Sequence, residues 1–298
     1  MPLTATTHVT KGVFMIINRK KGISYILVSS FCFALMSLCV KSVPNIPLAE
    51  KMFFRNFIGL LALLPTLLKS KELLRVTNKP FLLLRCTFGL LGVALYYWTI
   101  SQLPLGNAVI INKVSPFFVI LLSVMFLKEK ITKHQIGAVL IALGGAMLIV
   151  KPQFNLIVLP SLIGLLGALS AGAAYTTIKH LSKTDAATTI VFYFSLSSTL
   201  VMIPIMMFNG FVIPSFKEFV FLVGIGVSAL IAQMFMTNAY RHAPASELAI
   251  YTYANPIFSF VLGFIIFFEI PDTLTIFGGS FIILAALYSH LSKKNTPV

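Results

Sequence analysis

Hydrophobic residues fall in ten long runs along the chain, separated by short polar connections. An apolar run of about 20 residues lets an α-helix cross the roughly 30 Å hydrocarbon core of a membrane. The connections are too short to hold a soluble domain. The pattern predicts an all-α integral membrane protein with ten transmembrane helices, at approximately 22–40, 47–68, 80–100, 104–127, 132–150, 158–178, 186–208, 216–238, 243–268 and 272–290.

The fourth and ninth runs share one pattern, in which a proline opens the run, a second proline follows twelve residues later and a glutamate ends it. These residues are Pro104, Pro116 and Glu129 in the fourth run, and Pro244, Pro256 and Glu269 in the ninth. A proline within a helix lacks an N–H and leaves the carbonyl four residues earlier without its helical partner. Paired interrupted helices at equivalent positions point to the midplane binding site of a transporter. We therefore expect Pro116 and Pro256 to break their helices.

The two copies lie 140 residues apart, about half of the 298-residue chain, and each half holds five predicted spans. Lys41 and Lys179 repeat at a similar offset, as do Pro65 and Pro204. Because five is odd, the second half enters the membrane from the opposite side, which is the inverted repeat of many transporters. The expected organisation is a basic cytoplasmic tail, repeat 1, an outside linker, repeat 2 and a second cytoplasmic tail, at 1–21, 22–150, 151–157, 158–291 and 292–298.

Lysine and arginine residues set the expected orientation. With the N-terminus in the cytoplasm, the cytoplasmic segments carry 16 of these residues and the outside loops carry four. Cytoplasmic loops are enriched in Lys and Arg. Both termini are therefore expected in the cytoplasm.

Composition agrees with a membrane protein, since 58% of residues are hydrophobic and 10% are charged, against about 25% charged in soluble domains. The formal charge of +15 comes from residues between the apolar runs, which favours a topogenic role over nucleic-acid binding. The three cysteines form no metal or disulfide pattern. The first apolar run lacks a small-residue cleavage site, so we expect an uncleaved span.

Lys113 is the sharpest functional candidate. It lies about nine residues into its span, so roughly 14 Å deep, and a charge at that depth is costly and points to function. The alternative is snorkelling to an interface, which its stem of about 6 Å does not easily reach. No acidic residue lies at the same depth in any predicted span. We expect Lys113 and the adjacent Asn112 to bind an anionic group of a substrate, and proton release from the empty lysine would allow proton coupling.

Polar and aromatic residues on other spans complete the expected substrate site. The ninth span has Glu247, Tyr251, Asn255 and Ser259 four residues apart, on one helical face, where packing between helices is the alternative role. The remaining substrate-binding candidates are Ser37, Tyr96, Tyr175 and Gln233.

Glu50, Arg55 and Glu247 are the candidates for a gate or charge pair. Glu247 lies near the cytoplasmic end of its span, beside Arg241. Arg55 lies roughly 12 Å from the outer end of its span, so it needs a cavity or a partner such as Glu50. Arg85 lies close enough to the cytoplasmic end of the third span to snorkel.

Enzymatic chemistry finds little support in the sequence. His180 and Asp185 match an HxxxxD acyltransferase spacing, but the short loop offers nothing to hold a substrate. No phosphate-binding loop or HExxH motif is present. We therefore expect no enzyme, no metal and no cofactor.

The segment NAVIINKVSPFFVILLSVMFLKEK resembles the characteristic pattern of the drug/metabolite transporter superfamily, in its EamA-like branch, at Ser115-Pro116 and Leu127–Glu129. Residues 53–56, FFRN, also resemble a family pattern, and the second half keeps Asn255-Pro256 and Glu269. The resemblance covers nearly the whole chain. It implies two five-helix EamA repeats around a central cavity, secondary transport of small metabolites and no shared catalytic residue.

Together these features predict a carrier in a bacterial inner membrane that exports metabolites such as amino acids or organic acids by alternating access. A multidrug exporter of lipophilic cations is the first alternative, although such sites usually have a midplane carboxylate, which is missing here. Uptake of metabolites is the second. The expected partners are a small-molecule substrate and the lipid bilayer, with proton coupling and a homodimer left open and no nucleic acid.

Overall fold

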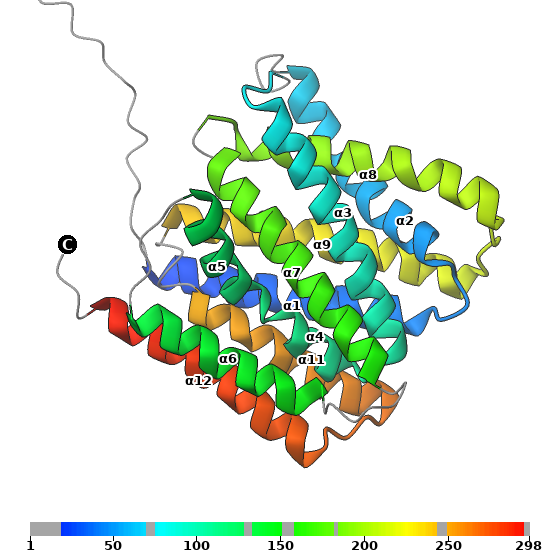
Figure 1. Ribbon diagram of the computed structural model, residues 1–298. Helices are drawn as coiled ribbons and strands as arrows, with labels where there is room; N and C mark the ends of the chain where they lie inside the picture. The colour runs from blue at the N-terminus through cyan, green and yellow to red at the C-terminus, as the bar shows by residue number, and fades with distance from the viewer. Residues whose placement is uncertain are drawn as a thin grey trace, which may run out of the picture.

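The computed structural model describes residues 19–69, 75–127, 133–150, 158–181, 184–242 and 249–294, and every regular element in these ranges is helical (Figure 1). Each of the ten apolar runs contains helix, and the fourth and ninth runs are each divided in two. The elements are α1 (Arg19–Ser42), α2 (Leu48–Lys69), α3 (Lys79–Gln102), α4 (Leu105–Asn112), α5 (Ser115–Leu127), α6 (Lys133–Val150), α7 (Leu159–Leu181), α8 (Ala187–Asn209), α9 (Phe216–His242), η3 (Ala249–Tyr253), α11 (Ala254–Phe267) and α12 (Thr273–Lys294).

Length and hydropathy make five helices in the described ranges able to cross a membrane by themselves, namely α1, α3, α7, α8 and α9. Shorter apolar helices occupy Leu105–Val119, Ile136–Leu148, Tyr251–Phe267 and Thr273–Ala285. The chain is thus a multi-helix membrane protein, as its hydrophobic pattern predicts.

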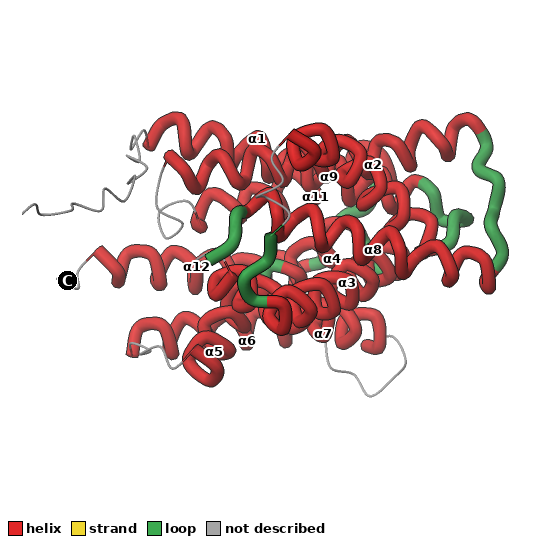
Figure 2. Tube along the Cα trace, turned by 90° about the horizontal axis from the view of Figure 1, so that it is seen from above, coloured by secondary structure: helices red, strands yellow, loops and turns green. Residues whose placement is uncertain are grey.

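The most extensive helix packing joins the two halves of the chain. Helix α1 packs on α9, α3 on α7, α2 on α8, and α6 on α12, and α6 and α12 lie side by side in Figure 1. Seen from above, α4 and α11 lie between the α1–α9 side and the α5–α6–α7 side (Figure 2). One part of each interrupted helix, α4 or α11, therefore lies near the centre of the bundle.

Small residues allow these helices to approach closely. A Cβ on Gly145 of α6 would lie 2.6 Å from the carbonyl oxygen of Gly278 on α12, and a Cβ on Gly92 of α3 would lie 3.0 Å from the backbone nitrogen of Ala171 on α7. Three alanines of α6, Ala138, Ala142 and Ala146, are buried on one face. Van der Waals packing between small residues is the main source of helix association in lipid.

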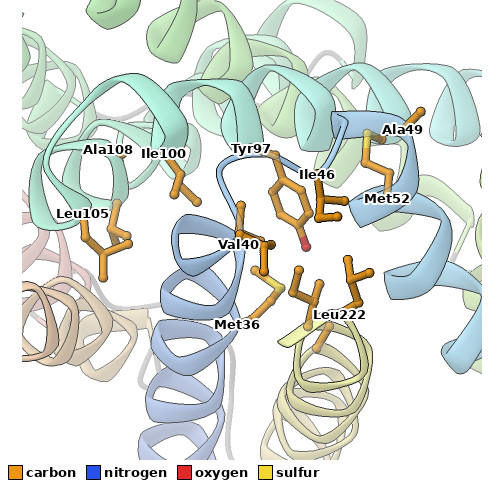
Figure 3. Close-up of a cluster of buried hydrophobic side chains, with 14 of the residues drawn as sticks. Met36, Val40, Ile46, Ala49, Met52, Tyr97, Ile100, Leu105, Ala108 and Leu222 are labelled. Atoms are coloured by element: carbon orange, nitrogen blue, oxygen red, sulfur yellow. The ribbon is translucent and has the colours of Figure 1, made fainter. Parts of the chain in front are cut away.

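The largest cluster of buried apolar side chains lies at the end of the bundle where α1 and α3 finish and α2, α4 and α9 begin. Its members include Met36, Val40, Tyr97, Leu105 and Leu222, and the Tyr97 ring projects among them (Figure 3). This end is called the Lys41 end below, because Lys41 lies in the last turn of α1.

Candidate functional site

The two interrupted helices meet at their breaks. Helix α4 ends at Asn112, Lys113 and Val114 form a turn, and α5 begins at Ser115. In the second half the 3₁₀ helix η3 gives way to α11 after Tyr253, which lies 140 residues beyond Lys113. The Tyr253 hydroxyl donates a 3.5 Å hydrogen bond to the Lys113 carbonyl oxygen. Equivalent positions of the two halves are thus in direct contact.

Backbone hydrogen bonds explain how the chain breaks at Lys113 inside an apolar environment. The Lys113 N–H is shared between the carbonyls of Val109 (3.2 Å) and Ile110 (3.0 Å), and the Val114 N–H reaches Ile111 at 3.0 Å. These tight turns place Pro116 in the first turn of α5. N–H groups in the first turn of a helix form no hydrogen bond within that helix, so the missing N–H of proline costs nothing there. Pro256 occupies the third position of α11.

The Lys113 ammonium forms no hydrogen bond or ion pair within the described ranges, although the side chain is half-buried. The five acidic residues in these ranges all accept hydrogen bonds elsewhere; they are Glu50, Asp185, Glu218, Glu269 and Asp272. Adjacent Asn112 is also half-buried. The break therefore presents a positive charge that the described protein does not neutralise.

Ser37 of α1 and Tyr96 of α3 are in direct contact. Their hydroxyl groups are hydrogen-bonded at 2.9 Å. Tyr175 of α7 is 47% exposed. Two of the expected substrate-binding side chains therefore form one polar pair.

Glu50 and Arg55 do not form the expected pair. Glu50 accepts a 2.9 Å hydrogen bond from the Val212 N–H, whereas Arg55 Nη1 donates to the Asn56 side chain at 3.0 Å and its guanidinium lies 5.9 Å from the Phe194 ring centroid. The two residues are five positions apart on α2, so they point to different sides of that helix.

Arg85 does not snorkel toward the near end of α3, contrary to the expectation from its position. Its side chain is 9% exposed, and its guanidinium lies 4.1 Å from the Phe194 ring centroid. A Cβ at Gly89 would overlap Nη1 of Arg85. The side chain therefore runs along α3 toward the helix middle, through the space that this glycine leaves open.

The candidates of the ninth run have mixed surroundings. Asn255 is buried and donates a 2.9 Å hydrogen bond to the Ser30 carbonyl of α1, so its amide joins two helices. Tyr251 is 36% exposed. Gln233 of α9 is half-buried, and Glu247 lies outside the described residues.

An ion pair between Lys41 of α1 and Glu269, just beyond α11, connects the two halves. Lys41 also donates to the Leu103 carbonyl at 2.7 Å, and Glu269 accepts from the Leu105 N–H at 2.7 Å. The positive φ of Phe268 (56°) ends α11 and turns Glu269 back, so that its N–H reaches the Gly263 carbonyl. This ion pair was not predicted from the sequence. Both residues belong to the sequence repeat, which marks them as candidates, but a repeat does not show which residues pair.

His180 and Asp185 have structural partners. The His180 ring stacks on Phe81 with centroids 4.0 Å apart, and Asp185 accepts a 2.7 Å hydrogen bond from the Thr77 N–H. Burial alone would raise the pKa of the Asp185 carboxyl group. The hydrogen bonds that this group accepts have the larger effect, so its pKa is lowered. The two residues join the start of α3 to the α7–α8 connection. Within the described ranges, no three His, Cys, Asp or Glu side chains are arranged to hold a metal.

Comparison with known proteins identifies the family. The model of the EamA-like transporter family matches residues 20–151 and again 159–290. A pseudopaline exporter, CntI, of Pseudomonas aeruginosa is 36% identical over 278 residues, which are 92% of this chain and 98% of that protein. An S-adenosylmethionine uptake transporter of Rickettsia prowazekii is 25% identical, covering 90% of this chain and 94% of that protein.

Two further comparisons agree with this match. A riboflavin transporter of Brucella anthropi is 27% identical and covers 85% of this chain and 90% of that protein. A solved crystal structure that is 15% identical superposes with a TM-score of 0.70 over 94% of this chain and all of that one, which shows a shared fold. The chain belongs to the EamA-like transporter family.

Proposed function

We propose that the protein is a secondary transporter that exports small anionic or zwitterionic metabolites, such as amino acids or organic acids, across a bacterial inner membrane. The proposed topology has ten spans in two inverted five-helix repeats, 22–150 and 158–291, with both termini in the cytoplasm. In this topology the Lys41 end faces outward. Alternating access would then expose the centre of the bundle to one side of the membrane at a time.

The uncompensated charge of Lys113 carries the proposal. It lies at the break between α4 and α5, at the centre of the bundle, and no acidic residue in the described ranges contacts it. A charge in this environment is stable only with a partner of opposite sign or in its neutral form. A substrate carboxylate would supply the partner, and loss of the proton from the empty site would couple transport to a proton gradient.

Asn112, Ser37, Tyr96, Tyr175, Tyr251 and Gln233 are proposed to contact the rest of the substrate. The Ser37–Tyr96 hydrogen bond positions one such polar pair. For Asn255 the bond to Ser30 supports a packing role beside the site. Glu247 remains a proposed gate residue near the cytoplasmic end.

The ion pair of Lys41 and Glu269, with the apolar cluster beside it, is proposed to close the outer end in this conformation. Both features join the first half of the chain to the second. Export must break both contacts, since they connect the segments that separate when the outer end opens.

The relatives support transport of small molecules, and their names include both export and uptake. The relative that is 36% identical is named an exporter, which favours export here, whereas another is named an uptake transporter. A lipophilic cation is disfavoured as substrate, because Arg55, Arg85 and Lys113 lie well inside the spans and the acidic residues of the described ranges already accept hydrogen bonds.

Removal of the Lys113 charge tests this function. Bacteria producing wild type, Lys113→Met or Lys113→Arg would be compared by untargeted mass spectrometry of cells and medium. We expect wild type to enrich one or more anionic or zwitterionic metabolites in the medium, Lys113→Met to abolish that enrichment, and Lys113→Arg to restore part of it because a planar fork replaces a point charge.

Lys217→Met, at an exposed position at the start of α9, is the matched control and should export normally. Normal export by Lys113→Met at equal protein level would contradict the proposal. Accumulation inside cells instead of the medium would show uptake.

A further inference from the structure

Two arginines share one aromatic ring in the interior between α2, α3 and α8. The guanidinium carbons of Arg85 and Arg55 lie 4.1 Å and 5.9 Å from the centroid of Phe194. The Nε atoms of both arginines are buried and have no hydrogen-bond partner. Beside Arg55, the buried Tyr97 hydroxyl also lacks a well-aligned hydrogen bond.

Arg85 has no hydrogen bond to any group in the described ranges, although it is 9% exposed and carries five N–H donors. The Phe194 ring provides a cation–π contact, which is weaker than a charge-assisted hydrogen bond to an anion. Like charges close together repel in a low-dielectric interior. A protein that keeps two such arginines together without acidic partners is arranged to receive an anion.

Gly89 supports this interpretation, because the absence of its side chain is what admits the guanidinium. Any larger residue there would occupy the position of Nη1. The open space directs Arg85 away from the near end of α3, where water would solvate it, and toward the middle of the bundle. Arg85 is therefore held in the interior despite having a shorter route to solvent.

We infer that Arg55 and Arg85 form a second anion subsite, and that the substrate carries at least two anionic groups, one bound by Lys113 and the other by this arginine pair. The inference rests on the proposed function, since it assumes that Lys113 binds substrate. Arginine forks bind carboxylate and phosphate in the same two-pronged way, so the second group is either of these.

Ligand-induced thermal stabilisation of the purified full-length protein tests this subsite without requiring a known direction of transport. The probes are lactate with one carboxylate, succinate with two, and phosphoglycerate with a carboxylate and a phosphate, at fixed ionic strength and at a pH where all are ionised. A ligand that binds the folded state raises its melting temperature in proportion to its affinity. We expect succinate or phosphoglycerate to bind wild type at least about tenfold more tightly than lactate.

Arg85→Met should weaken the binding of succinate or phosphoglycerate, whichever binds wild type more tightly, by about tenfold or more. The binding of lactate should weaken by less than about twofold. Gly89→Ala should do the same while keeping both arginines, because the new methyl group displaces the guanidinium. Arg85→Lys should cause an intermediate loss of affinity, since lysine keeps the positive charge but lacks the planar guanidinium that binds an anion with two hydrogen bonds. Arg75→Gln, which removes an exposed positive charge, and Gly144→Ala, whose added methyl group meets nothing, are the matched controls.

Two results would overturn the second subsite: equal or absent stabilisation by all three acids in wild type, or unchanged selectivity in both Arg85→Met and Gly89→Ala. Loss of lactate binding in Lys113→Met, by contrast, reports on the first subsite. Failure of the arginine subsite can therefore be distinguished from failure of the proposed function.

Discussion

The two ends of the helix bundle are packed differently. At the Lys41 end, the last turns of α1 and α3 and the first turns of α2, α4 and α9 bury a continuous apolar cluster, and an ion pair lies beside it. At the opposite end, a small separate cluster in the described ranges contains two buried residues, Ile26 and Ala239. A second large cluster, which includes Ile111, Phe117 and Ile282, lies between α4, α5, α6 and α12. The two halves are therefore joined along much of the bundle, whereas the ion pair lies at the Lys41 end.

This difference contrasts with the sequence, which repeats at both ends. By the repeat, Lys179 corresponds to Lys41 and Glu129 corresponds to Glu269, and Glu129 lies outside the described residues. The side chains of Lys179 and Glu129 both lie outside the described part of the structure, so the difference between the ends is seen in the apolar clusters. An inverted repeat allows this, because two related sequences can exchange conformations when the carrier moves between its two states.

The largest expected effect comes from weakening the apolar cluster. Leu105 is fully buried there, and truncation of a buried leucine costs about 2–5 kcal/mol. We expect Leu105→Ala to lower the free energy of unfolding by about 3 kcal/mol in detergent titrations followed by circular dichroism. Leu83→Ala at the opposite end is the matched control, with an expected loss below about 0.5 kcal/mol. Equal losses would show that the apolar cluster around Leu105 does not stabilise the protein.

An intermediate effect is expected from breaking the ion pair. Glu269→Gln leaves Lys41 without its carboxylate and weakens the acceptor for the Leu105 N–H, which should favour opening of the Lys41 end by about 1–3 kcal/mol. Cys39 is half-buried on α1 beside this cluster and reports on opening. In a Cys32→Ser, Cys86→Ser background, labelling of Cys39 by a membrane-impermeant thiol reagent should become about tenfold faster.

Glu218→Gln controls for loss of an acid at the same end, because Glu218 accepts hydrogen bonds from Ser215, three residues earlier in the chain. It should leave Cys39 labelling unchanged. A similar labelling rate in wild type and Glu269→Gln would show that the ion pair does not hold this end closed.

The smallest effect concerns Asp185 at the opposite end. Its hydrogen bonds from the Thr77 N–H and the Thr184 hydroxyl outweigh burial and lower the pKa of Asp185. A lowered carboxyl pKa stabilises the folded protein above the unfolded-state pKa of about 3.9, and this stabilisation is lost as the pH falls through the folded-state value. Asp185→Asn should therefore cost about 1 kcal/mol at neutral pH.

The difference between wild type and Asp185→Asn in unfolding titrations should shrink as the pH is lowered below about 4. A difference that grows on acidification would contradict the assignment. The Cys39 labelling rate should not change, since Asp185 lies at the other end of the bundle.

Hydrophobic periodicity located the helices and their interruptions well. Each of the ten apolar runs contains helix, and the spacing of Pro116 and Pro256 placed the disturbed regions in the fourth and ninth runs. Both signals are local, because helix length and proline geometry depend on neighbouring residues. The buried face of small residues on α6 could be derived from the same local spacing.

Tertiary structure decided which side chains meet. Lys41 and Glu269 are more than two hundred residues apart, so no periodicity specifies that they pair. The direction of Arg85 depends on Gly89 in its own helix and on Phe194 of α8, and the partner of Glu50 is a backbone N–H beyond α8. A hydrophobic pattern reports which face of a helix is apolar, whereas ion pairs and arginine contacts depend on how two helices cross.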